Sequence, residues 1–279
     1  MPKLLHPSKL RCLGALLLLL SASACGMAQQ PTGADQNGKA AEMQAKIAMD
    51  VARNERAAGD AAQAIDYYRS ARELDPSRWV AASTGLGDTL LEIGKPNEAA
   101  EAYREALTRS PNNGPALNGL GVALVKLDQP AAAIDALHRG LATTLDPRAF
   151  RALGVAEDLL GRFGDAVADC QNGLVHFPDE QGLREDLGLS QAFNGDFDAA
   201  IATMRAAAAS PNAAVRDQLN LALVLGLAGH TTEAAQVAAA NMDEASVQNN
   251  LAYYAHLRAI SPGERVALLL RSSAATMEH

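Results

Sequence analysis

Apolar and small residues recur along the chain at a spacing of about 34 residues, with polar stretches between them. Each copy of this pattern has a Leu-Gly pair, a second Gly, a small residue, an aromatic or apolar residue, another small residue and a Pro. One complete copy consists of Leu86, Gly87, Gly94, Ala99, Tyr103, Ala106 and Pro111. The second Gly suits the left-handed end of a helix, and Pro stops the helix that precedes it. Each copy therefore predicts two helices joined by a tight turn.

The turn position identifies the successive copies. It holds, in chain order, Gly59, Gly94, Asp128, Gly161, Gly195 and Gly229. Asp128 is a departure from the expected Gly, and the sixth copy is the weakest. Residues 247–254 resemble the first helix of a seventh copy that lacks a second helix. The pattern predicts about six helix pairs and a capping helix over residues 40–260.

The period and the residue types resemble those of the tetratricopeptide repeat, a helix-turn-helix unit that stacks into a solenoid. This resemblance implies an all-α fold in the form of a right-handed superhelical solenoid, which offers a surface for holding other molecules. A series of unrelated amphipathic helices is the alternative. It does not explain why four to five positions match in five copies.

Glycines inside the first helices need a packing reason, because Gly costs about 1 kcal/mol relative to Ala there. We expect each to let the second helix approach closely at the small residue twelve positions later. The expected pairs are Gly87–Ala99, Gly121–Ala133, Gly154–Ala166 and Gly188–Ala200. Tyr68 and Tyr103 are expected to fill the gap to the following repeat, and Trp79 to pack between the first two repeats. Cys170 occupies the slot of these tyrosines and is expected to be buried and inert.

The first residues predict targeting rather than structure. Residues 1–24 combine three cations with an apolar run at 13–20 that is too short to span a bilayer. Residues 22–25 (Ala-Ser-Ala-Cys) resemble a bacterial lipobox, which implies that Cys25 begins the mature chain and carries a lipid. Gly26 in place of Asp implies, by the same resemblance, the periplasmic face of the outer membrane. Ordinary signal cleavage also fits these small residues, and it would leave a soluble periplasmic protein.

Two polar segments flank the predicted repeats. Residues 25–39 are rich in polar residues and Gly, and we expect a flexible tether. Residues 261–279 are expected to form a C-terminal tail outside the solenoid.

Composition argues against several functions. The formal net charge is −8, whereas binding to nucleic acid needs clustered Lys and Arg. No two His lie three to five residues apart, so no helix-face metal pair is expected. Neither a Gly-x-Ser-x-Gly elbow nor a phosphate-binding Gly-rich loop occurs. We therefore expect a protein that is not an enzyme and that uses no cofactor, metal or small-molecule substrate.

Binding to a protein partner is predicted on the concave face, which the first helices of the repeats line. The register places the following residues there: Arg53, Arg56, Asp88, Asn118, Lys126, Arg151, Asp158 and Glu185. A second polar and aromatic patch comprises Asn249, Asn250, Tyr253 and Tyr254. The alternative for the first set is that these side chains are only solvated and contact no partner. The alternative for the second patch is that it caps the last apolar face of the solenoid.

The lipobox, the tether, the repeats and the closing Asn-Leu-Ala-Tyr-Tyr segment at 250–254 together resemble the TadD-type lipoproteins of tight-adherence (Flp) pilus assembly. The resemblance implies an outer-membrane scaffold that acts as a pilotin-like assembly factor for the secretin of the pilus machine. A general periplasmic scaffold for another envelope machine, or a non-catalytic cofactor of cell-wall enzymes, stays open as an alternative. The lipobox, Asp128 and the segment after Ser261 depart from the expected pattern.

Overall fold

The computed structural model describes residues 33–276, and the side-chain surroundings of residues 37–269. This part of the chain consists of α-helices and one short 3-10 turn, and it contains no strand. The elements are α1 (Gly33–Ala57), α2 (Ala61–Leu74), η1 (Pro76–Arg78), α3 (Trp79–Glu92), α4 (Pro96–Arg109), α5 (Gly114–Lys126), α6 (Pro130–Leu141), α7 (Pro147–Leu159), α8 (Phe163–His176), α9 (Gln181–Phe193), α10 (Phe197–Ala208), α11 (Val215–Ala228), α12 (Thr231–Ala239), α13 (Glu244–Ala259) and α14 (Pro262–Thr276).

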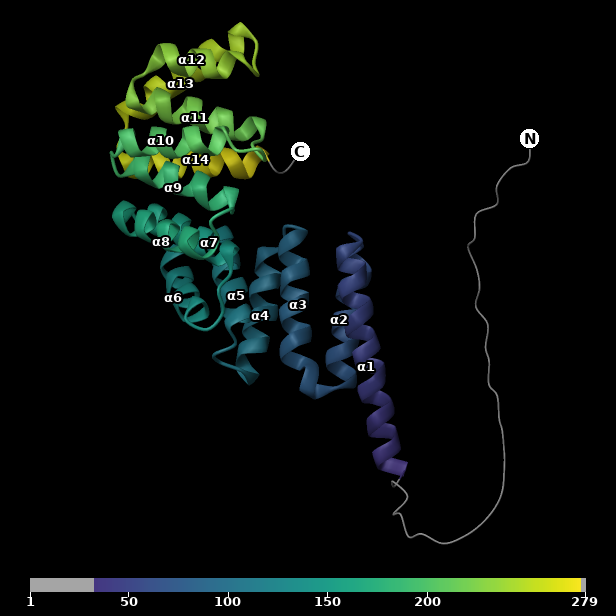
Figure 1. Cartoon of the computed structure of the whole chain (residues 1–279). Helices are drawn as coiled ribbons and strands as arrows, with labels where there is room; N and C mark the ends of the chain where they lie inside the picture. The colour runs from purple at the N-terminus through teal and green to yellow at the C-terminus, as the bar shows by residue number, and fades with distance from the viewer. Residues whose placement is uncertain (1–32, 277–279) are drawn as a thin grey trace, which may run out of the picture.

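Helices α1 to α12 form six antiparallel pairs that stack one on the next (Figure 1). Within each pair the turn residue has the left-handed backbone that Gly adopts without penalty. The φ angle is 73° at Gly94 and 87° at Gly229. Asp128 has a φ of 56°, so a non-Gly residue adopts the same conformation in the third pair. The predicted all-helical solenoid is confirmed.

Proline occurs at several of the helix boundaries. Pro111 and Pro178 follow the ends of α4 and α8, where they prevent the helix from continuing. Pro96 and Pro130 instead begin α4 and α6, at the first helical position that has no backbone hydrogen bond to lose. Proline thus marks the start of α4 and α6 and the end of α4 and α8, whereas α12 has proline at neither end.

The side chains nearest to the mid-helix glycines are not those that the sequence predicted. A Cβ added to Gly87 would lie 2.7 Å from the ring of Tyr103, and one added to Gly154 would lie 2.7 Å from Cys170 Sγ. The nearest partner is therefore the large residue sixteen positions later, and the predicted Ala166 also lies close, with its carbonyl oxygen 3.7 Å from the Cβ position of Gly154. Counted from the turn residue Gly94, Gly87 lies seven residues before the turn, Ala99 five residues after it and Tyr103 nine residues after it, so both positions lie almost level with Gly87 in the antiparallel pair. The long side chain of Tyr103 leans toward the start of its helix, and this brings the ring over Gly87.

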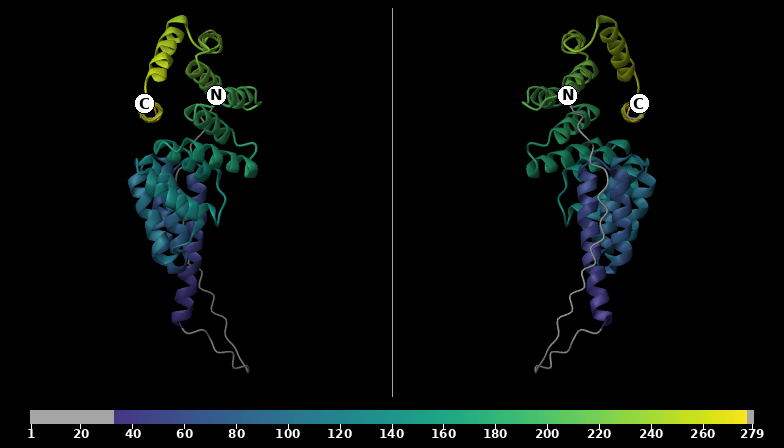
Figure 2. Two further views of the ribbon diagram at one scale, coloured as in Figure 1. Left: turned by 90° about the vertical axis from the view of Figure 1, so that its left-hand side faces the viewer. Right: turned by 90° about the vertical axis from the view of Figure 1, so that its right-hand side faces the viewer.

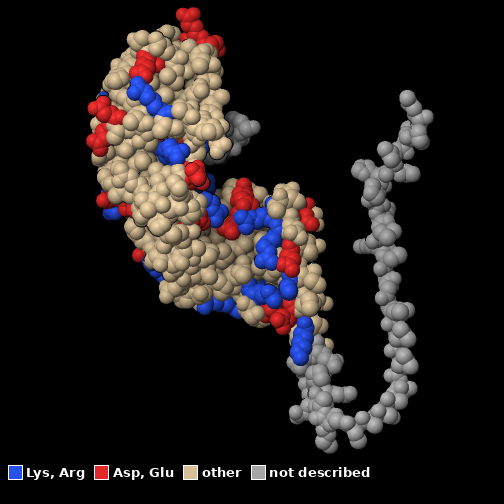
Figure 3. Space-filling model, viewed as in Figure 1, with Lys and Arg blue, Asp and Glu red and all other residues tan. Residues whose placement is uncertain are grey.

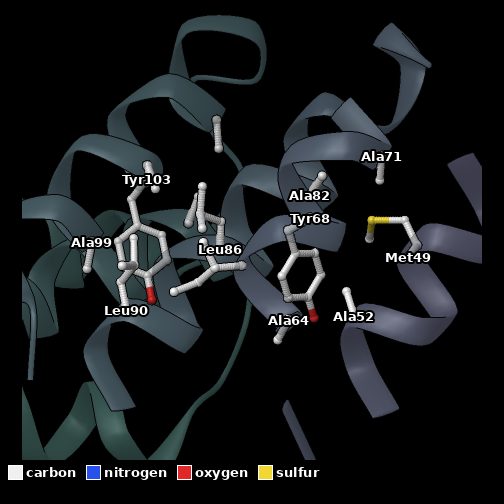
Figure 4. Close-up of a cluster of buried hydrophobic side chains, with 14 of the residues drawn as sticks. Met49, Ala52, Ala64, Tyr68, Ala71, Ala82, Leu86, Leu90, Ala99 and Tyr103 are labelled. Atoms are coloured by element: carbon white, nitrogen blue, oxygen red, sulfur yellow. The ribbon is translucent and has the colours of Figure 1, made fainter. Parts of the chain in front are cut away.

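The tyrosines fill the gaps between repeats, as predicted. Tyr103 also contacts Gly119 of the next repeat, and Tyr68 contacts Gly85. Both rings are buried together with Leu86 in the N-terminal core (Figure 4). Trp79 lies at the junction of the first two repeats, with Arg72 at 5.0 Å and Arg109 at 4.3 Å from its ring centroid.

The two ends of the described chain differ from the expected boundaries. Helix α1 begins at Gly33, within the segment predicted to be a tether. The segment predicted to be a tail contains α14, which begins at Pro262 and leaves α13 to contact α7. The predicted targeting segment at 1–24 and Cys25 lie outside the described residues.

Candidate partner-binding surface

The first helices of the repeats line the inner arc of the solenoid. Helices α1, α3, α5, α7, α9 and α11 each contact the next first helix in the series, whereas successive second helices make no comparable contact. Neighbouring helices come closest on the shorter, inner arc of a curved stack, so these first helices form the concave face. The two side views show the curvature (Figure 2).

An ion-pair network occupies the N-terminal end of this concave face. Arg56 on α1 contacts Glu92 at 2.7 Å and Asp88 at 3.3 Å, both on α3. The hydroxyl group of Tyr103 donates a hydrogen bond of 2.7 Å to the other oxygen of Asp88. The hydrogen bond to Glu92 holds the pKa of the Arg56 guanidinium above its usual value. Two predicted residues, Arg56 and Asp88, thus join in one network.

Further charged side chains around this network reach solvent. Arg53 on α1 forms an ion pair with Asp50 but has 60% of its side chain exposed. Lys126 at the end of α5 and Arg148 on α7 are also exposed. Figure 3 shows both signs of charge gathered on the side of the N-terminal half that faces the hollow between the two halves of the molecule. This surface, formed by α1, α3, α5 and the start of α7, is called the charged groove below.

Three predicted site residues are buried instead of facing a partner. Asn118 is 1% exposed, and its amide donates a hydrogen bond of 2.8 Å to the carbonyl of Thr144. Asp158 is 6% exposed and accepts a hydrogen bond from Ser190. Glu185 is 4% exposed and pairs with Arg216. The register placed them on the correct helices, but these side chains point between helices because each bonds to a neighbouring helix or loop.

Acidic side chains concentrate where α7 meets α9. Arg151, a predicted site residue, donates a hydrogen bond of 2.7 Å from Nε to Asp186. Burial raises the pKa of Asp158 to about 7, despite the opposing hydrogen bond from Ser190. Burial also raises the pKa of Asp186, against the favourable charge of Arg151. This acidic cluster connects adjacent first helices and is a structural feature of the solenoid.

The residues of the polar and aromatic patch near the end of the chain differ in how deeply they are buried. Tyr254 is 5% exposed and packs over Gly226 of α11. Tyr253 is partly buried against the C-terminal core, which is the cluster of buried apolar residues that includes Leu225 of α11 and Leu257 of α13. Asn250 contacts the sulfur of Met242, and Asn249 is exposed. The described contacts thus show Tyr254 covering the last repeat, and they leave Asn249 as the accessible member of the patch.

Sequence reasoning missed the partners of the charged residues. Arg56 pairs with Glu92, Arg151 with Asp186, and Glu185 with Arg216. Each pair links consecutive repeats. The available signal was two opposite charges about one repeat length apart in the sequence. Ion pairs between successive repeats are therefore part of what sets the stacking.

The described part of the chain contains no feature of a metal or membrane-spanning site. Its His, Cys, Asp and Glu residues form no group of three or more able to hold a metal ion. No helix between residues 33 and 276 combines the length and the apolar character needed to cross a bilayer. Cys170 is completely buried, and burial raises the pKa of its thiol above the usual value, as expected for an inert core residue.

Comparisons with known proteins agree with this architecture. Residues 49–114 and 90–154 match two family profiles, both described as tetratricopeptide repeat. Tetratricopeptide repeat protein 21B of Xenopus laevis is 32% identical over 116 residues, which are 41% of this chain and 8% of that protein. The chain thus spans a small fraction of the length of that relative.

Solved structures extend the likeness to most of the chain. PilW, a widely conserved type IV pilus biogenesis factor, has a TM-score of 0.64 at 22% identity, covering 74% of this chain and 98% of PilW. PilF of Pseudomonas aeruginosa has a TM-score of 0.58 at 19% identity, covering 84% and 99%. MamA has a TM-score of 0.51 at 29% identity, covering 59% and 90%.

The fold and the concave face define a helical repeat scaffold of the kind that binds other proteins. The profile matches identify tetratricopeptide repeats within residues 49–154, and the helix pairs outside this range continue the same architecture. Proteins built from tetratricopeptide repeats are in general non-catalytic scaffolds for protein interaction.

Proposed function

We propose that this protein is a lipid-anchored scaffold of the bacterial envelope, and that its charged groove binds a protein component of a pilus machine. The observation that carries this proposal is the charged groove itself. Arg53, Lys126 and Arg148 expose charge beside the network of Arg56 and Asp88. Exposed charges of both signs on a concave surface suit an extended polypeptide with polar and charged groups.

The choice of a pilus machine rests on two kinds of similarity. PilW is a type IV pilus biogenesis factor, and nearly its whole length superimposes on this chain. The sequence from the lipobox-like residues 22–25 to the Asn-Leu-Ala-Tyr-Tyr segment resembles TadD-type lipoproteins. Both similarities support the finer proposal of a pilotin-like factor for a secretin of a tight-adherence (Flp) pilus.

Site-specific photo-crosslinking in cells tests the groove. A crosslinking amino acid at Arg53 or Lys126 is expected to capture the secretin or another pilus-assembly component. The matched control is Arg69 on the second helix α2, whose side chain is 49% exposed. Equal capture of the same protein from position 69, or capture of no pilus component from the groove positions, would contradict the proposal.

The lipid anchor is tested by Cys25→Ser. If Cys25 carries a lipid, this change removes the only proposed attachment, because stable anchoring depends on the acyl chains. We expect the variant to move from the membrane fraction to the soluble periplasmic fraction, with an unchanged far-UV circular dichroism spectrum. Cys170→Ser is the control, since that thiol is buried in the core. Membrane retention of the Cys25 variant would overturn the anchor.

A further inference from the structure

We propose that the C-terminal half of the concave face binds an amphipathic α-helix of a partner protein, and that the chain's own α14 occupies this place in the free protein. The inference rests on the proposed scaffold function and names the class of partner. It concerns the concave face from α7 to α13, which adjoins the charged groove at α7.

The placement of α14 departs from the repeat pattern. In α1 to α12 each second helix packs along the first helix that precedes it. Helix α14 follows α13 after only Ile260 and Ser261, yet its main contact is with α7, several repeats back in the chain. Figures 1 and 2 show α14 running back toward the middle of the molecule. It therefore lies across the inner side of the C-terminal repeats and does not extend the solenoid.

One face of α14 is apolar and buried. Val266 is 1% exposed, and Leu269, three residues later on the same helical face, packs against the C-terminal core. That core includes Leu225 of α11 and Leu257 of α13, both completely buried. This inner surface thus accepts apolar side chains at the spacing of a helix, which is the pattern of helix-in-groove recognition.

The start of α14 is stabilised by its own residues. The carboxylate of Glu264 accepts the backbone N–H of Ser261 at 3.0 Å, and the backbone N–H of Glu264 in turn donates to Ser261 Oγ at 3.3 Å. This reciprocal arrangement is a capping box. In addition, Arg265 Nε donates to the carbonyl of Leu257 at 3.0 Å. The capping box lies within the start of α14 itself, so release of α14 from the concave face leaves this cap intact.

The outer edge of α14 is incompletely covered. Leu268 is 39% exposed and borders a hollow of about 290 Å³ that Ile260, Glu264 and Ala267 also line. The helices of the repeats, in contrast, pack between neighbours on two sides. Helix α14 is held on one face, so a partner helix with the same apolar spacing and a larger contact can displace it. Because a short linker tethers α14, its local concentration at this surface is on the order of mM. A partner helix has to overcome this local concentration to displace α14.

A labelled peptide of residues 261–276 is the probe, and its binding to the full chain is measured by anisotropy. Val266→Asp in the full chain places a charge on the buried face and releases α14. We expect the peptide to bind this variant at least tenfold more tightly than it binds the unmodified chain. Leu268→Asp, at the exposed edge of the same helix, is the matched control and is expected to behave like the unmodified chain. Equal affinity for all three chains would overturn the proposal.

A second variant covers the case in which Val266→Asp loses its helical circular dichroism signal. Leu269→Ala only removes carbon atoms from the same face and is expected to give the same preference for the peptide. A dimer of either variant that the peptide does not dissociate would show that the surface pairs two copies of this chain, and this outcome also overturns the proposal. The assay contains no envelope component, so its failure is distinct from a failure of the crosslinking test of the charged groove.

Discussion

At the scale of single residues, Asp158 lies between α7 and α9 with one carboxylate oxygen bonded to Ser190 and the other buried without a hydrogen-bond partner. Burial disfavours its charged form and raises its pKa from 3.8 to about 7. Between these two pH values the folded state binds more protons than the unfolded state. The free energy of unfolding therefore falls as the pH rises through this range.

Asp158→Asn removes this pH dependence because an amide is neutral at every pH. We expect the variant to be more stable than the unmodified chain at pH 8 by about 2–4 kcal/mol, because the amide avoids the cost of burying a carboxylate that is ionised at this pH. Urea titrations at pH 4 and pH 8 measure the effect, which is expected to vanish at the lower pH. Asp135→Asn, with 75% of the Asp135 side chain exposed, is the control. A smaller free energy of unfolding at pH 8 for the Asp158→Asn variant than for the unmodified chain would contradict the argument.

The close approach at Gly154 gives a second prediction at this scale. Gly154→Ala places a methyl group 2.7 Å from Cys170 Sγ, and overpacking of this kind costs about 1–3 kcal/mol. The double variant with Cys170→Ala makes room for the methyl group and is expected to recover part of that loss relative to Cys170→Ala alone. Thermal unfolding of the four chains gives the coupling free energy. Gly164, which has open space around it, serves as the control for Gly→Ala. Strict additivity would refute the predicted contact.

At the scale of the helices, the turn of the third repeat contains Asp128 where the other turns have Gly. Asp128 adopts a φ of 56°, which is uncommon for residues with a Cβ. Asp128→Gly is expected to stabilise the chain by about 0.5–1 kcal/mol, because Gly has no steric cost in this conformation. The shift of the urea midpoint measures it, and Gly161→Asp is expected to shift the midpoint in the opposite direction. If Asp128→Gly does not stabilise the chain, the Asp128 side chain offsets the strain of its left-handed backbone, and the prediction is wrong.

The sequence predicted the helices and turns well because their signals are local. Gly94 and Pro111 each determine the backbone around themselves, and the structure places them as expected. Interhelical contacts were predicted less well, as with Tyr103 in place of Ala99 nearest to Gly87, since they depend on the length and direction of each side chain. The candidate site was partly predicted. Arg56 and Asp88 meet in one network, but the burial of Asn118 depends on the loop after α6, which the repeat pattern does not describe.

At the scale of the whole molecule, each repeat contacts mainly its neighbours, so damage is expected to stay local. Tyr254 covers the last repeat from α13 and is 5% exposed. Tyr254→Ala is expected to cost about 3 kcal/mol in that region, roughly a hundredfold in the local opening equilibrium. Hydrogen exchange should accelerate in α11 to α13 and stay unchanged in α1 to α6. Uniform acceleration along the chain would contradict the expectation that the damage stays local. The control is His256→Ala, because His256 is an exposed residue on the same helix.

The ring of Trp79, set between two guanidinium groups at the first repeat junction, gives the protein a built-in optical reporter. It is the single tryptophan of the sequence. Its intrinsic emission therefore follows the melting of the N-terminal repeats, whereas the ellipticity follows the helices of the whole stack. When these two signals change at different urea concentrations, the difference directly measures how far the two ends of the solenoid unfold independently.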